Sequence, residues 1–247
     1  MIQRTPYADA LTYGLMIAGF LLLIGPLLVV IAGASQSVVQ VNSIPFSFLP
    51  QGEFLTNAQT AWQRANLGNA LLNSMIMATL VTIGKVALSA FTAFAIVFFR
   101  SPLKHLFFWT VFITLMLPLE VRVVPTYSVA ADIFQPFRSI LGWFGIEVSV
   151  EWNLLNSYVG LTLPLVATAT GTFLYRQFFM TIPDELAEAA RMDGSGPIRF
   201  FVEMLLPLSR TNMAALTTIM FVYAWNQYLW PLLMVTDPSY KTVMMSL

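Results

Sequence analysis

Lys85 is the residue whose position raises the first chemical question. It lies near the middle of an apolar stretch, residues 69–99, that contains no carboxylate. A charge at this depth in a bilayer costs about 2.5–3.5 kcal/mol on insertion scales, so the ammonium group must face a cavity or a partner. Either Lys85 attracts an anionic substrate such as a phosphate ester, or it pairs with a carboxylate on another helix or on a partner chain.

Glu120 and Arg122 form a second charged site near one end of the apolar stretch 106–129. Two residues apart, they would point in different directions on a regular helix, but Pro118 and Pro125 make this stretch irregular. A guanidinium can hold a phosphate through two parallel hydrogen bonds. Arg122 therefore either contacts an anionic ligand or belongs to a gate, paired with Glu120 or with a partner subunit.

An amphipathic cluster lies at the outer end of the last long apolar stretch and consists of Trp225, Asn226, Gln227, Tyr228 and Trp230. Aromatic residues at that position are typical of the belt at a membrane–water interface. The two carboxamides need hydrogen-bond partners inside a span. They bind either the hydroxyl or phosphate oxygens of a substrate or the groups of neighbouring helices.

The sequence contains no recognisable catalytic arrangement. It has no cysteine, one histidine (His105), and no G-x-x-x-x-G-K-[ST] phosphate loop. Thiolate and His-rich metal sites are therefore excluded, and the net charge of zero argues against a nucleic-acid partner. We expect no catalytic residue, no metal site and no bound cofactor in this chain.

The amino-acid composition indicates whether these residues lie in water or in a membrane. Hydrophobic residues make up 57% of the chain and charged residues 10%, against about 25% charged residues in soluble domains. Apolar segments long enough to span a bilayer are expected at residues 11–32, 69–99, 106–129, 158–179 and 212–235. The sequence predicts an all-α polytopic membrane helix bundle, with residues 1–247 forming one transmembrane domain.

Residues 180–210 interrupt the apolar pattern with a charged segment typical of a helical hairpin. Thr181 can cap a first helix, and Gly194 can take the positive φ angle that ends it. Pro197 suits the start of a second helix, and Pro207 should interrupt that helix.

Within this hairpin, Glu188-Ala189-Ala190 is followed by Gly194 and, after a fixed gap, by Leu206-Pro207. This spacing resembles the EAA loop of membrane subunits of binding-protein-dependent ABC importers, with Met204 in place of the usual Ile. In that family the loop docks into a groove on the ATPase subunit. The resemblance implies an ATPase-coupling role for Glu188, Ala189, Ala190, Asp193, Gly194 and Pro207. A generic amphipathic hairpin on the membrane surface is the alternative.

The segments 89–100, 113–126, 173–194 and 225–233 are similar to carbohydrate-type ABC permeases with a MetI-like fold, most of all to those that take up sn-glycerol-3-phosphate. The resemblance implies import of that compound or a glycerophosphodiester, with other sugars and polyols as alternatives. It implies a homologous second (A-type) permease, two ATPase subunits that hold ATP and Mg, and an extracytoplasmic binding protein. Candidate residues of the substrate pathway are Lys85, Arg122, Trp225, Asn226, Gln227 and Tyr228.

The distribution of lysine and arginine predicts the orientation in the inner membrane. With a cytoplasmic amino terminus, the inner side carries Arg4, Arg100, Lys104, Arg176, Arg191, Arg199 and Arg210, and the outer side carries Arg64, Arg138 and Lys241. This orientation also places the hairpin in the cytoplasm, where an ATPase can reach it.

Two further expectations concern the class of the protein. Members of the resembled family carry a sixth helix after a segment like residues 242–247, so a sixth span is expected to be missing from this sequence. An autonomous secondary transporter or a membrane sensor is the alternative class. An ion-coupled carrier should show intramembrane carboxylates and inverted repeats, and the apolar segments show no carboxylate except Glu120 near an edge.

Overall fold

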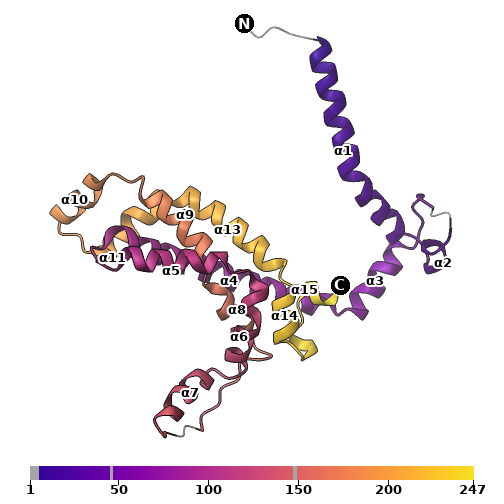
Figure 1. The fold of residues 1–247 in the computed structure, drawn as a ribbon. Helices are drawn as coiled ribbons and strands as arrows, with labels where there is room; N and C mark the ends of the chain where they lie inside the picture. Colours follow the sequence, from indigo (N-terminus) through magenta and orange to yellow (C-terminus); the bar gives the residue numbers. More distant parts are fainter. Residues whose placement is uncertain (1–5, 45–46, 147–148) are drawn as a thin grey trace. The chain divides into compact units, whose positions relative to one another are not determined.

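The computed structural model describes residues 6–44, 47–146 and 149–247, and within these ranges it is helical without β-strands (Figure 1). The chain divides into two compact units, residues 1–67 and 68–247. Arg4, which contributes to the predicted orientation, lies outside the described residues.

The first unit contains one long apolar helix, α1 (Pro6–Ala34), followed by α2 (Val38–Val41) and α3 (Phe54–Arg64). Gln36 fixes the connection after α1, because its Nε2 donates to the carbonyl oxygens of Ser47 and Leu49 at 2.6 and 3.0 Å. Most side chains of α1 are exposed within this unit, so its apolar surface is available to lipid or to another subunit.

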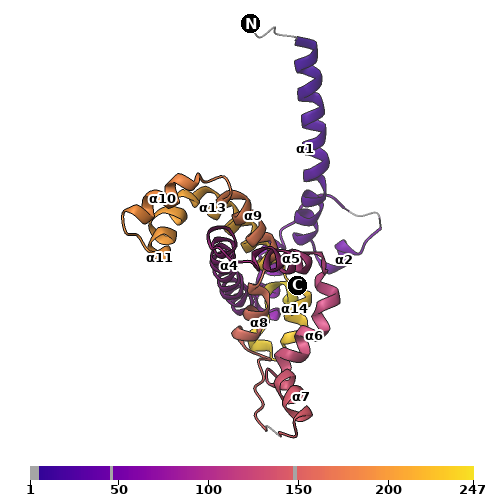
Figure 2. The same cartoon turned by 60° about the vertical axis from the view of Figure 1, so that its left-hand side comes forward.

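The second unit consists mainly of helices of unequal length. They are α4 (Leu67–Phe98), α5 (Lys104–Met116), α6 (Leu119–Ala131), α7 (Gln135–Trp143), α8 (Tyr158–Val166), α9 (Ala169–Phe179), α10 (Asp184–Met192), α11 (Pro197–Phe200), a π-helical turn (Phe201–Leu205), α12 (Leu206–Leu208), α13 (Arg210–Trp225), α14 (Leu229–Met234), a 3₁₀ turn (Pro238–Tyr240) and α15 (Val243–Ser246). The buried side chains of α4 contribute to both hydrophobic clusters of this unit. Figures 1 and 2 show α10 and α11 at one end of α4, and α8 and α14 toward the other.

Several of the expected spans are broken in the structure. By length and composition, Asp9–Ala34 and Leu67–Phe98 could each cross a membrane. Two bent pairs could each form one more span: α8 with α9, bent by 44°, and residues 197–208 with α13, bent by 78°. The expected stretch 106–129 is divided between α5 and α6 at Pro118, and the stretch 212–235 is divided between α13 and α14.

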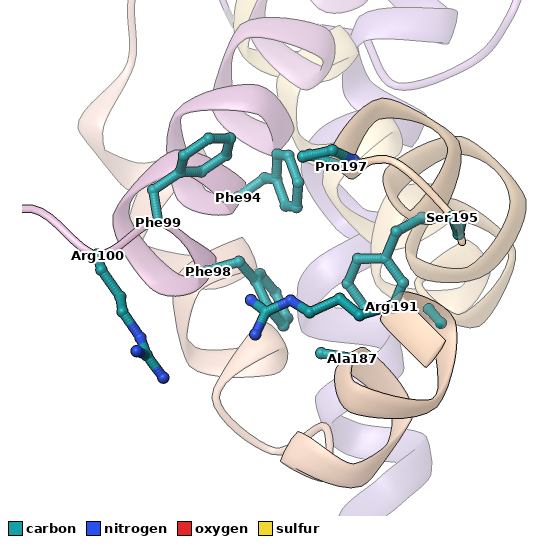
Figure 3. A pocket seen from close by; sticks show the side chains of 10 residues that line it. Phe94, Phe98, Phe99, Arg100, Ala187, Arg191, Ser195 and Pro197 are labelled. Carbon is teal, nitrogen blue, oxygen red and sulfur yellow. The ribbon is translucent and has the colours of Figure 1, made fainter. Parts of the chain in front are cut away.

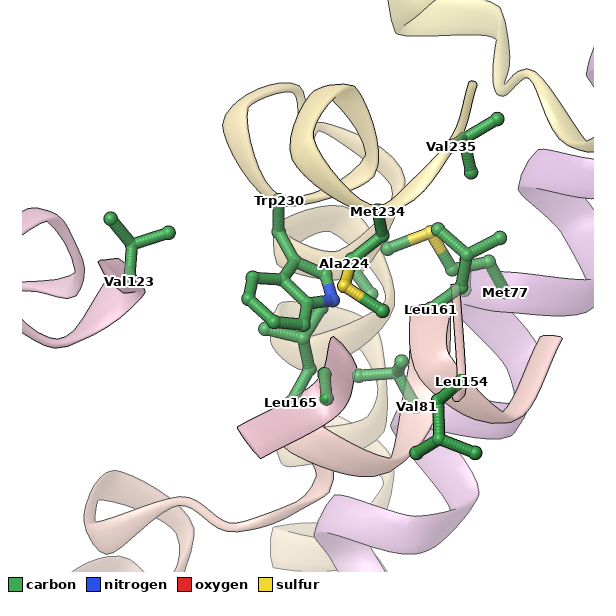
Figure 4. Packing of buried hydrophobic residues seen from close by; sticks show 12 residues of the cluster. Met77, Val81, Val123, Leu154, Leu161, Leu165, Ala224, Trp230, Met234 and Val235 are labelled. Atoms are coloured by element: carbon green, nitrogen blue, oxygen red, sulfur yellow. The ribbon is translucent and has the colours of Figure 1, made fainter. Parts of the chain in front are cut away.

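Pro164 lies inside α8, three residues before the break between α8 and α9 at Ala167. Proline has no amide hydrogen, so the Gly160 carbonyl loses its partner within the helix. The buried Trp230 supplies a replacement, because its Nε1 donates to that oxygen at 3.2 Å. Around the indole ring, Leu161, Leu165 and neighbouring apolar residues form the first hydrophobic cluster (Figure 4). Through this hydrogen bond and the packing of the indole ring, α14 holds α8 in place.

Candidate functional site

The charged hairpin at residues 180–210 folds as α10, a turn and the α11–α12 segment. Gly194 has a φ angle of +74°, as predicted for the turn. The Ser195 amide donates to the Ala190 carbonyl at 2.9 Å, which closes the end of α10. The turn therefore depends on a backbone conformation that L side chains rarely adopt.

The predicted cap of the first hairpin helix was wrong. Pro183, not Thr181, occupies the capping position of α10, and no side chain caps it. The Thr181 hydroxyl instead donates to the Phe178 carbonyl at 2.7 Å, at the end of α9. The extended backbone of Pro183 delays the start of the helix to Asp184, beyond the reach of Thr181. Asp184 and Glu185 still place negative charge at the helix amino terminus, where the helix dipole favours it.

Pro197 and Pro207 behave as the sequence predicts. Pro197 occupies the first position of α11. A π-helical turn comes before Pro207, and the chain bends by 78° before α13 begins at Arg210. Pro207 cannot donate to the Glu203 carbonyl, so the regular α-helical pattern is interrupted in the turn before it. The chain then passes through Pro207 in the short α12 and bends after Leu208.

The hairpin is attached to the bundle by aromatic side chains. Phe201 stacks on Phe91, with ring centroids 4.7 Å apart, and is tilted against Phe94 at 4.9 Å. Phe200 contacts Phe98 edge-on at 5.4 Å. On α10, Ala190 is buried and belongs to the same hydrophobic cluster as Phe94, Phe200 and Phe201. Sequence reasoning did not single out these phenylalanines, although Phe91, Phe94 and Phe98 share one face of a helix by their spacing.

The remaining residues of the EAA pattern lie on the surface of the hairpin. Glu188, Ala189, Asp193, Gly194 and Pro207 are all exposed, whereas Ala190 is 1% exposed. The hairpin thus has one face attached to α4 and an opposite face available to another protein.

Beside these contacts, a hollow of about 230 Å³ lies between the hairpin and the end of α4 (Figure 3). Phe94, Phe98 and Phe200 give it an apolar wall, and Arg100 and Arg191 lie at its edge. In Figure 3 the Arg191 side chain extends from α10 toward Phe98.

Lys85 and Arg122, far apart in the sequence, line a single cavity of about 560 Å³. Its walls come from α4, α5, α6, α9 and α13 and from the break between α8 and α9. The hydroxyl-bearing residues on these walls are Thr92, Thr110, Thr168, Thr170, Thr172 and Tyr223. The structure therefore brings together two of the predicted pathway residues in a cavity whose other walls combine hydroxyl-bearing and apolar residues.

Lys85 is 5% exposed, and its ammonium nitrogen lies 4.3 Å from the centroid of the Tyr223 ring. This cation–π contact partly replaces the water that the ammonium loses on burial. Within the described parts of the chain, Lys85 forms no ion pair. Sequence reasoning missed Tyr223, because a contact between α4 and α13 leaves no local signal in the sequence.

Arg122 is partly buried, and its Nε has no hydrogen-bond partner in the structure as described. The predicted pair between Arg122 and Glu120 cannot be followed, because the Glu120 side chain lies outside the described residues.

The structure does not place the other pathway candidates in this cavity. Asn226 and Gln227 donate to the carbonyl oxygens of Val222 and Tyr223, within the last turn of their own helix. Trp225 stacks on Phe221 at 5.9 Å, and Tyr228 is 50% exposed. These residues lie at and just after the end of α13 and do not line the cavity with Lys85 and Arg122.

Comparison with known proteins identifies the family. The family described as "Binding-protein-dependent transport system inner membrane component" matches residues 85–246. The chain is 45% identical to the sn-glycerol-3-phosphate transport system permease protein UgpE of Escherichia coli O1:K1 / APEC. It is 47% identical to the protein of the same name from Yersinia pestis bv. Antiqua (strain Antiqua). Each alignment covers 98% of this chain and 82% of the relative.

A solved structure shows the same fold. A bacterial ABC transporter involved in the import of the acidic polysaccharide alginate matches 97% of this chain and 79% of its own, with a TM-score of 0.70 and 19% identity. The helical architecture, the hairpin and the sequence similarity agree. The chain belongs to the family of inner membrane components of binding-protein-dependent transport systems, as a permease subunit of an ABC importer.

Proposed function

We propose that this permease carries sn-glycerol-3-phosphate, or a related glycerophosphodiester, across the inner membrane after delivery by an extracytoplasmic binding protein. Two relatives named for sn-glycerol-3-phosphate transport, 45% and 47% identical over 98% of the chain, support this substrate. The cavity that contains Lys85 and Arg122 agrees with an anionic substrate, because both side chains carry positive charge.

The observation that best supports a mechanism of coupling to ATP hydrolysis is that the hairpin has two different faces. Its inner face packs on α4 through Phe200 and Phe201, and its outer face exposes Glu188, Ala189 and Asp193. An ATPase subunit docked on the outer face moves the hairpin when it binds and hydrolyses ATP. The aromatic contacts transmit that motion to the bundle, which alternates between outward and inward access.

In the complete transporter, this chain assembles with a homologous A-type permease, two ATPase subunits and the binding protein, surrounded by membrane lipid. ATP and Mg are held by the ATPase subunits, and the amino terminus of this chain faces the cytoplasm. This orientation agrees with the predicted excess of lysine and arginine on the side of the hairpin. An autonomous secondary transporter does not agree with the family membership.

Uptake into proteoliposomes tests the proposal. The complex of this chain with its partner permease and ATPase should accumulate labelled sn-glycerol-3-phosphate only when ATP and the loaded binding protein are both supplied. An excess of unlabelled glycerophosphodiester should compete, and an uncharged disaccharide should not. Accumulation of a sugar or polyol in place of the phosphate ester, by a complex with intact ATPase activity, would contradict the substrate assignment.

A further inference from the structure

We infer that the 560 Å³ cavity binds the phosphate group of the transported substrate between Lys85, Arg122 and the uncapped amino terminus of α9. The inference rests on the proposed function, because it requires the transported compound to be a phosphate ester. It assigns the phosphate site to this permease and gives each of the three groups a role.

The charges in the cavity favour a phosphate group. Lys85 and Arg122 both line the cavity, and none of the described residues that line it with them is aspartate or glutamate. Lys85 has no ion-pair partner within the described chain, and the buried Arg122 Nε has no hydrogen-bond partner there. Two cations that face one cavity repel each other, and a phosphate dianion between them removes that repulsion. Guanidinium also has the geometry to bind phosphate oxygens through two hydrogen bonds.

The break between α8 and α9 adds a second, independent attraction for an anion. Because α8 ends at Val166, the first amide groups of α9, at residues 169–171, have no hydrogen-bond partner within a helix. Thr168 occupies the capping position but makes no capping hydrogen bond. Thr168, Ala169 and Thr170 all line the cavity. The positive end of the α9 dipole therefore lies at the cavity wall, together with amides that have no partner within the helix. Broken helices in other transporters likewise direct their amino termini at anionic substrates.

The threonine hydroxyls suit the rest of a small phosphorylated polyol. Thr110 and Thr172 donate to the backbone carbonyls of Leu106 and Thr168, at 2.9 and 3.1 Å. Their hydrogens are thus in use, but each oxygen retains a lone pair that can accept a hydrogen bond. The hydroxyl groups of glycerol can donate hydrogen bonds to these threonine oxygens. The substrate class that fits the cavity is a phosphate ester of a short polyol.

Neutral substitutions in the fully assembled transporter test the site. Lys85→Met and Arg122→Gln remove the charges and keep most of the side-chain volume. Lys104→Met and Arg64→Gln are matched controls, because both wild-type residues are exposed and lie outside the cavity. Two quantities are measured. The first is the amount of labelled sn-glycerol-3-phosphate accumulated per ATP hydrolysed, at a saturating concentration of loaded binding protein. The second is the yield of assembled complex.

We expect Lys85→Met and Arg122→Gln to lower uptake per ATP at least tenfold while assembly and stimulated ATPase activity stay near the control values. Lys85→Arg should recover most of the uptake, because it restores the positive charge. Uptake per ATP at control level in both neutral variants would overturn the inference, as would a loss of assembly that parallels the loss of uptake.

A double variant tests whether Arg122 serves only to form an ion pair with Glu120. If Arg122 only neutralises Glu120, then Glu120→Gln combined with Arg122→Gln should recover uptake, and this recovery would overturn the phosphate site. We expect no recovery. Failure of the proposed function gives a different result, because the wild-type complex would then not accumulate sn-glycerol-3-phosphate at all.

Discussion

Gly194 is the residue on which the shape of the coupling hairpin depends most directly. Its positive φ angle allows α10 to end and the chain to return toward α4. The sequence predicted this conformation, because glycine at the end of a charged helix is a common stop signal. The contact between Lys85 and Tyr223 could not be predicted in the same way, since it depends on how α4 and α13 pack.

Gly194→Val should abolish ATPase stimulation by the loaded binding protein and leave the chain in the membrane. The left-handed conformation costs an L residue about 1–2 kcal/mol, more for a β-branched side chain, so the turn should rearrange. Gly196→Ala is the control, because Gly196 has a φ angle of −73° and open space around its Cα. Stimulated ATP hydrolysis is the measurement. Equal stimulation in both variants would show that the turn geometry is not needed for coupling.

At the scale of elements, hydropathy predicts where apolar segments lie but not where they break. Residues 158–179 read as one apolar span, yet the structure divides them at Ala167 and Thr168. Pro164 removes one hydrogen bond from α8 before that division, and the compensating bond from Trp230 depends on tertiary packing. Thr181 shows a similar limit, because a good capping residue does not cap when the following proline moves the helix start.

Trp230→Phe should destabilise the packing of α14 against α8. Phenylalanine fills much of the same space but cannot donate to the Gly160 carbonyl, and a buried acceptor without a partner costs about 1–3 kcal/mol. We expect the temperature at which the purified complex loses its assembled form to fall by several degrees, as followed by size-exclusion chromatography after heating. Trp143→Phe is the control, because Trp143 is 91% exposed. The same temperature for both variants would mean that the bond contributes nothing measurable.

At the scale of the whole molecule, much of the apolar surface of each unit has no cover within that unit. Most side chains of α1 are exposed, as are Ile83, Leu88 and Phe91 on α4. Lipid can cover such surfaces, but a polar cavity such as the one around Lys85 also needs protein walls. The membrane location and the helical class follow from composition, whereas the surfaces that meet a partner cannot be separated from those that meet lipid by composition alone.

Affinity purification of this chain from membranes should yield a complex with one different permease and two copies of an ATPase. Glu188→Lys should reduce the amount of ATPase recovered and leave the partner permease in place, because Glu188 is exposed on the hairpin. The measurement is the ratio of subunits by quantitative mass spectrometry. A monodisperse preparation of this chain alone that transports substrate would contradict the expected assembly.

The 78° bend before α13 has a mechanical consequence. Tyr223 lies thirteen residues beyond Arg210 on the same helix, which corresponds to about 20 Å of helix length. If α13 moves as a rigid lever, a tilt of about 5° at the bend displaces Tyr223 by about 2 Å. The ring now lies 4.3 Å from the Lys85 ammonium, and a displacement of this size takes it to the limit of cation–π attraction, about 6 Å. A small rotation of the hairpin would thus be amplified into the uncovering of a buried positive charge.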